Sequence, residues 1–153
     1  MKRELPIKFN HAEVWLDEAA QMLSHRYIRC GYITPKLRVL YGFTTSGFRR
    51  AAKHRILGQC LARSWSRNGE NIIIISPHRK EAVDILTTLG HEIAHAIDDC
   101  QNNHGKEFKE ILLGFGYLFS GKSDYPSRDL LDEYRSMAEL LGKFPLLRLI
   151  DEI

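Results

Sequence analysis

The chain has 153 residues, a formal net charge of +3, and 44% hydrophobic against 27% charged residues. These values predict one soluble globular domain, residues 1–153, with a core of its own. The longest useful apolar run, the isoleucines at 72–75, is too short to cross a membrane, and the charged N-terminus lacks the apolar segment of a secretory signal.

Residues 10–30 predict a helix, because Asn10 is suited to the N-cap, Glu13 completes a capping box and Gly31 is suited to the C-terminal end. Apolar and other residues then alternate over residues 37–41, which is typical of a half-buried strand.

Residues 44–53 fit either a loop or a short helix. Residues 56–66 predict a second strand, and the turn signal Asn68-Gly69 joins it as a hairpin to a third strand at 71–76. The four consecutive isoleucines of this third strand favour burial on both of its faces.

A longer helix is expected next, with Ser76 as N-cap and Pro77 at its first position. Its apolar positions recur at helical spacing and form one buried stripe. They are Val83, Leu86, Gly90, Ile93 and Ile97.

The last third predicts a turn at 102–103, a helix over 106–118, a loop over 120–126 and a final helix that Pro145 ends. Residues 146–150 are expected to fold back on the core. The final helix is marked by its apolar positions Leu130, Tyr134, Met137 and Leu141. The order predicts an α+β fold with a small three-stranded sheet packed on helices.

Charge is distributed unevenly along the chain. Residues 19–69 contain no Asp or Glu but ten basic residues, whereas residues 70–153 contain fifteen acidic and nine basic ones. A basic segment with interspersed aromatic residues is a candidate contact for DNA or RNA. The alternative is a solvated face that balances the acidic half. The candidate nucleic-acid contacts are Arg49, Arg50, Lys53 and Arg55.

The cysteines, Cys30, Cys60 and Cys100, are odd in number, far apart and form no CxxC pair. They support neither a disulfide framework nor a zinc ribbon. We therefore expect a reducing location, cytoplasmic or associated with a nucleoid or nucleus, and no secretion.

The main chemical motif is His-Glu-Ile-Ala-His at residues 91–95, followed by His104. Residues i and i+4 share one helix face, so His91 and His95 can hold one metal ion with His104 as third ligand. Glu92 lies about 100° around the helix and is placed to act as general base. The pattern predicts one catalytic Zn²⁺ per chain. The alternative is a surface helix whose histidines contact nothing.

Other residues have more open roles. Asp99, four residues after His95, is either an acceptor for a ligand imidazole or part of a solvated turn. Cys100 is a candidate neighbour of the metal. A donor for a developing oxyanion is also expected. Its candidates are Tyr117, Tyr125, Tyr134 and His78.

Four segments within residues 10–118 belong together: Gly58-Gln59-Cys60, the strand at 71–76, Thr-Leu-Gly-His-Glu-Ile-Ala-His-Ala at 88–96, and His-Gly-Lys-Glu-Phe at 104–108. Together they resemble the SprT-like metalloproteases, the family of the Spartan-related proteases. The resemblance implies a zincin-like fold, peptidase chemistry, zinc on His91, His95 and His104, and Glu92 as base. The chain departs from the family in its short segment between the second and third histidines and in lacking a C-terminal zinc ribbon.

Two functions follow as hypotheses. The first is a zinc endopeptidase whose substrate is a protein or peptide, including protein bound to nucleic acid, held by strand addition beside the metal. The alternative is a non-catalytic nucleic-acid-binding module with a structural zinc. Glu92 favours the first, because a structural zinc site needs no base.

Overall fold

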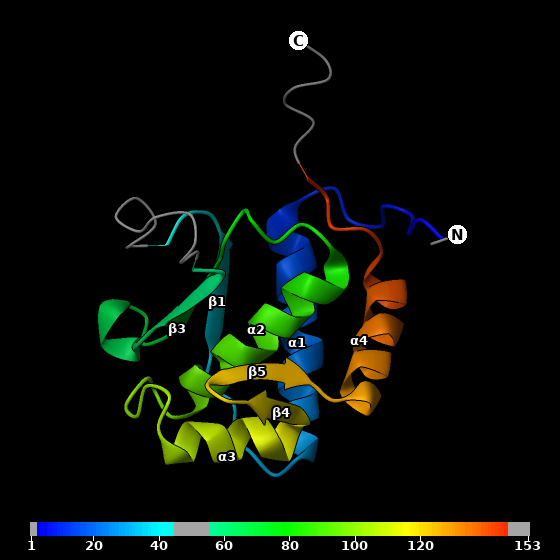
Figure 1. Ribbon diagram of the computed structural model, residues 1–153. Helices are drawn as coiled ribbons and strands as arrows, with labels where there is room; N and C mark the ends of the chain where they lie inside the picture. The colour runs from blue at the N-terminus through cyan, green and yellow to red at the C-terminus, as the bar shows by residue number, and fades with distance from the viewer. Residues whose placement is uncertain (1–2, 45–55, 147–153) are drawn as a thin grey trace.

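The computed structural model describes residues 3–44 and 56–146 (Figure 1). These residues form an α+β fold with four α-helices, a mixed three-stranded sheet and a separate two-stranded hairpin. In chain order the elements are α1 (Ala12–Arg29), β1 (Leu37–Tyr41), β2 (Gly58–Leu61), the 3₁₀ helix η2 (Arg63–Trp65), β3 (Asn71–Ile75), α2 (Ala82–Ile97), α3 (Lys106–Phe115), β4 (Tyr117–Ser120), β5 (Ser123–Pro126) and α4 (Arg128–Leu141).

The main sheet has the strand order β1-β3-β2. β1 runs parallel to β3, and β2 runs antiparallel to it with Gly58 opposite Ile75. The expected pairing of the second and third strands is therefore confirmed, although β2 ends at Leu61 and η2 follows. Among the described strands, β2 lies at one edge of this sheet, and it packs beside α2.

Burial of the central strand β3 differs from the sequence expectation. Ile73 and Ile75 are fully buried, whereas Ile72 and Ile74 are only half-buried. The expectation that both faces are covered is wrong, because α1 and α2 pack on the sheet and leave residues such as Leu40 38% exposed.

The core lies between the sheet and the helices (Figure 1). α4 packs against both α1 and α2. The indole of Trp15 in α1 donates to the Gly142 carbonyl at 3.0 Å, and its ring makes an edge contact with Phe144. α1 begins one residue after His11 and two after the expected N-cap Asn10, and it ends in a reversal at Gly31 with φ +94°.

α2 begins at Ala82, later than predicted, because residues 76–79 form a turn. The Arg79 amide donates to the Ser76 carbonyl at 2.9 Å, and the Ser76 hydroxyl accepts from the His78 amide at 3.3 Å. The Tyr41 hydroxyl donates to the Arg79 carbonyl at 3.0 Å. Ser76 therefore stabilises the end of β3 and does not cap the helix.

The segment after α3 was predicted as helix and loop, and it forms the β4–β5 hairpin instead. α3 ends at Phe115 because Gly116 has φ +124°, and Gly121, with φ +60°, lies between the two strands. α4 is capped by the Ser127 hydroxyl, which accepts from the Leu130 amide at 3.2 Å. It ends at Leu141, with Gly142 as its C-cap, before Pro145.

The sequence left open whether residues 44–53 form a loop or a short helix, and all of them except Thr44 lie outside the described residues. Residues 147–150, which were expected to fold back on the core, lie outside them too. Within residues 3–44 and 56–146, no helix has the length and hydrophobicity needed to span a membrane.

Candidate metal centre

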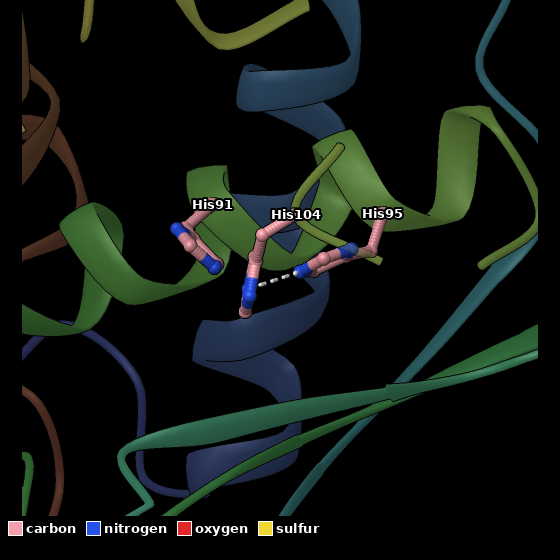
Figure 2. A group of neighbouring side chains, drawn as sticks. All are labelled: His91, His95 and His104. Carbon is pink, nitrogen blue, oxygen red and sulfur yellow. Dashed lines mark hydrogen bonds between the residues drawn. The ribbon is translucent and has the colours of Figure 1, made fainter. Parts of the chain in front are cut away.

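The three predicted histidines meet at one point (Figure 2). His91 and His95 extend from the same face of α2, and His104 comes from the segment between α2 and α3. One ring nitrogen from each lies within 4.8 Å of the other two, and the Nε2 atoms of His95 and His104 are 3.2 Å apart. The three histidines are therefore close enough to bind one metal ion.

The segment that returns His104 to α2 has unusual backbone geometry. Asp99, Cys100 and Asn103 have φ values of 53°, 59° and 49°, which are rarely adopted by residues other than glycine. The Cys100 amide donates to the His95 carbonyl at 2.8 Å, and the Gly105 amide to the Asn102 carbonyl at 2.8 Å. These left-handed residues give the reversal that brings the third histidine back within a few residues.

The Asp99 carboxylate fastens this segment to the main sheet. Its Oδ1 accepts from the Arg63 amide at 2.8 Å and from the Asn71 side chain at 2.9 Å. These hydrogen bonds lower the pKa of Asp99. Asp99 lies in a turn directly after α2, as the second alternative expected, and its side chain is 23% exposed. Its carboxylate bonds the Arg63 amide and Asn71 and not a ligand imidazole, so the first alternative is wrong.

Phe108, fully buried in α3, contacts all three imidazoles. The His95 ring stacks on it with centroids 3.9 Å apart and an interplanar angle of 15°. His91 and His104 approach it more steeply, with centroids at 5.1 and 5.2 Å. In the sequence, Phe108 appeared only as the last residue of the His-Gly-Lys-Glu-Phe segment at 104–108. Its role as the packing surface for the three histidines emerges from the structure.

Asp124 in β5 is a second residue that the sequence did not single out. Its Oδ2 lies 2.9 Å from Nδ1 of His91. Burial by itself lowers the pKa of His91, but the hydrogen bond to Asp124 and the charges of Glu92 and Asp124 outweigh it and raise that pKa.

The other two histidines are shifted in the opposite direction. Burial, followed by the nearby charges of His91 and His104, lowers the pKa of His95 to about 3. The pKa of His104 is also lowered, by burial and by His91. Both imidazoles are therefore neutral at pH 7 and have lone pairs available for a metal.

Glu92 lies on α2 beside the histidines and is 6% exposed. Burial raises its pKa to about 7. Within the described part of the chain, the group of residues close enough to hold one metal ion contains the three histidines and not Glu92, Asp99 or Glu107. Glu92 is thus placed beside the candidate site and not among its ligands.

β2 passes very close to this carboxylate. A Cβ at Gly58 would lie 2.6 Å from Cγ2 of Thr88 and 3.1 Å from Oε1 of Glu92. A side chain at this position would therefore collide with α2, and glycine allows the edge strand to border the site.

A cavity of about 780 Å³ lies over the site. β2 lines it with Gly58, Gln59 and Cys60, and α2 lines it with Thr88, Glu92, His91 and His95. Cys100 also lines the cavity, and its thiol donates to the Cys60 carbonyl at 3.5 Å. It is a neighbour of the site, as expected, but is not in the histidine group.

The candidate oxyanion donors do not line this cavity. Tyr117 and Tyr134 are fully buried, their hydroxyls are 2.6 Å apart, and Tyr117 donates to the Thr87 carbonyl at 2.7 Å. They stabilise the core behind α2. His78 and Tyr125 are exposed outside the cavity lining.

The proposed nucleic-acid contacts Arg49, Arg50, Lys53 and Arg55 lie outside the described residues. Among the other basic residues of the acid-free segment, Arg26 is paired with Glu133 and lies over the Phe115 ring. Its charge is therefore used within the fold.

No family model, curated protein or solved structure matches the chain.

Proposed function

We propose that the chain is a zinc-dependent endopeptidase that hydrolyses peptide bonds of protein substrates. The observation that carries the proposal is a buried carboxylate, Glu92, with a pKa of about 7, beside three converging imidazoles that do not include it as a ligand. Metallopeptidases need this separation of metal ligands and proton acceptor.

The donor set fits zinc. Three imidazoles are typical of catalytic zinc sites with one open position. Two nitrogens bound to one tetrahedral zinc at about 2.0–2.1 Å would be roughly 3.3–3.4 Å apart, and the Nε2 atoms of His95 and His104 are 3.2 Å apart. A zinc ion bound there would supply Lewis acidity that polarises a carbonyl and makes water more acidic.

The protein groups would then perform the proton transfers. Glu92, with a pKa near neutrality, is suited to accept a proton from water and return it to the leaving amine. A zincin-like fold and membership of the SprT-like proteases form part of this proposal. They are supported by the edge strand beside the helix of residues 91–95 and by the return of His104.

The edge strand also favours an extended peptide as substrate. β2 has β3 on one side and lines the cavity with Gly58, Gln59 and Cys60. Pairing of main chains along an edge strand requires no particular substrate sequence. We therefore expect unfolded or extended protein segments to be bound better than small molecules.

The test is to measure zinc content and cleavage of a labelled unfolded protein for the wild type and Glu92→Gln. The variant should retain about one zinc per chain and lose activity at least about a hundredfold, because the base is removed and its shape is preserved. Glu110→Gln, at a solvent-exposed position of α3, is the matched control. Cleavage by Glu92→Gln at the wild-type rate would refute the proposed mechanism.

The histidines are tested separately by His91→Ala, His95→Ala and His104→Ala, each of which should lose most of the zinc. Stable zinc binding by a wild-type chain that cleaves neither unfolded nor nucleic-acid-bound protein would favour the alternative, a binding module with a structural zinc.

One observation supports nucleic acid as a further partner. Trp65 in η2 is 70% exposed, and Arg67 follows it in the same acid-free segment. An exposed aromatic ring beside a positive charge is suited to stack on an unpaired base. DNA or RNA binding would bring the peptidase to nucleoprotein substrates.

The binding test is fluorescence anisotropy with single- and double-stranded oligonucleotides at two salt concentrations. Affinity should fall with salt by a log–log slope of about −0.7 to −0.9 per phosphate contact. Reversing Arg49, Arg50 and Lys53 to Glu should weaken binding to both oligonucleotides, and Trp65→Ala should mainly weaken the single-stranded complex. Absence of binding at low salt would leave the segment as a solvated basic face.

A further inference from the structure

We infer that Asp124 is a positioning residue for the metal ligand His91, holding its imidazole so that Nε2 faces the metal. This inference rests on the metal site of the proposed function but not on peptidase activity. The two residues are far apart in the sequence, and the β4–β5 hairpin brings them together with Oδ2 2.9 Å from Nδ1. Both side chains are largely buried, at 17% and 20% exposure.

The contact determines which nitrogen of His91 is available. A carboxylate only accepts hydrogen bonds, so Nδ1 carries the proton and Nε2 of a neutral ring keeps its lone pair. In Figure 2 one nitrogen of His91 is directed toward His104 and the other points away. A carboxylate on the outer nitrogen of a ligand imidazole fixes its orientation and makes the other nitrogen a stronger donor.

His91 needs this support more than His95 does. The His95 ring lies flat on Phe108, which fixes its plane. His91 meets the same ring at 68°, so this packing constrains its rotation less. The hydrogen bond from Nδ1 to Asp124 supplies the missing constraint.

The hairpin is built to hold this carboxylate in place. Asp124 is paired with Phe119 across the hairpin, and Tyr117 at the start of β4 is fully buried and bonded to the Thr87 carbonyl. Thr87 precedes His91 by one helical turn. Asp124 is therefore directed at α2 from a hairpin whose other strand, β4, is itself bonded to α2 through Tyr117.

Asp124 could instead be a merely structural link between the hairpin and α2, or it could ligate the metal itself. Direct ligation is disfavoured because Asp124 does not belong to the group of described residues that converge on one point, which contains only the three histidines. A structural link would affect stability, whereas a positioning residue affects the affinity for metal and the tautomer of His91.

The test is to measure zinc affinity by competition with a chromophoric chelator for the wild type, Asp124→Asn and Asp132→Asn. Asp124→Asn keeps the shape and one acceptor oxygen but removes the charge, so zinc should bind about 10- to 100-fold more weakly. Asp132→Asn makes the same change at an exposed position in α4 that pairs with Arg135 and should leave affinity unchanged.

A second measurement uses the wild type alone and remains valid if Asp124→Asn folds poorly. Long-range ¹H–¹⁵N NMR of the zinc-loaded protein should show the His91 proton on Nδ1 and metal on Nε2. A proton on Nε2, or equal zinc affinity in wild type and a folded Asp124→Asn, would overturn the inference.

The outcomes separate this inference from the peptidase proposal. If Asp124→Asn weakens zinc binding while the wild type cleaves no protein, positioning by Asp124 stands and the peptidase proposal falls. If the wild type binds no zinc, both fall.

Discussion

Replacing the buried Glu92 by Gln should stabilise the metal-free protein at and above neutral pH. In the folded chain the pKa of Glu92 is raised from 4.5 to about 7 by burial. Between pH 4.5 and pH 7 the Glu92 carboxyl gives up its proton in the unfolded chain but keeps it in the folded chain. The wild type therefore loses stability as the pH rises from about 4.5 to about 7. Gln has nearly the same shape and no charge, and its burial carries no such penalty.

The magnitude follows from the two pKa values. A tenfold change in a proton equilibrium corresponds to about 1.4 kcal/mol, so the difference between the two pKa values corresponds to roughly 3 kcal/mol of folding free energy. Glu92 is 6% exposed, so solvent screening reduces this little. Glu92→Gln should therefore be about 3 kcal/mol more stable than wild type at pH 8 and nearly equal to it at pH 4.5.

The assay is urea unfolding of both proteins, in the presence of a chelator, across this pH range. With zinc added the difference should shrink, because a nearby dication favours the ionised carboxylate. A stability difference that does not change with pH, or a less stable Gln variant at pH 8, would refute the claim that a charged Glu92 is costly in the apo site.

Two glycines give further predictions. Gly58→Ala places a Cβ 2.6 Å from Cγ2 of Thr88 and should reduce peptidase activity while zinc content is retained, with partial recovery when Thr88→Ser removes that methyl group. Gly90→Ala places a Cβ 2.4 Å from the hydroxyls of Tyr117 and Tyr134, and urea unfolding should show a loss of about 1–3 kcal/mol, smaller when Tyr134→Phe is added. Wild-type behaviour of either single variant would show that α2 can move away from the intruding carbon.

The parts of the site that follow local rules could be predicted from the sequence. The periodicity around residues 91–95 predicts a helix with two imidazoles on one face, and α2 carries both. Asn68-Gly69 predicts the hairpin that places β2, and the structure has that pairing. The return of His104 could also be expected, because only a short segment separates it from α2.

The supporting contacts of the site could not be predicted, because they depend on tertiary packing. Asp124 lies in a four-residue strand whose sequence is polar and half exposed, which made it indistinguishable from a loop. Asp99 seemed suited to a ligand imidazole by its spacing from His95. Its left-handed backbone, with φ 53°, instead directs the carboxylate to the Arg63 amide.

The β4–β5 hairpin links the candidate metal site to the core through one turn of α2. Tyr117 donates to the Thr87 carbonyl from the buried side, and Asp124 holds His91 on the cavity side, one turn further along. On the buried side this turn of α2 is closely packed. The hydroxyls of Tyr117 and Tyr134 fill the space beside Gly90, and the Tyr27 hydroxyl donates to the Gly90 carbonyl at 2.7 Å. Because this turn is held on both sides, the position of His91 depends on the packing of the core as well as on its own side-chain torsions.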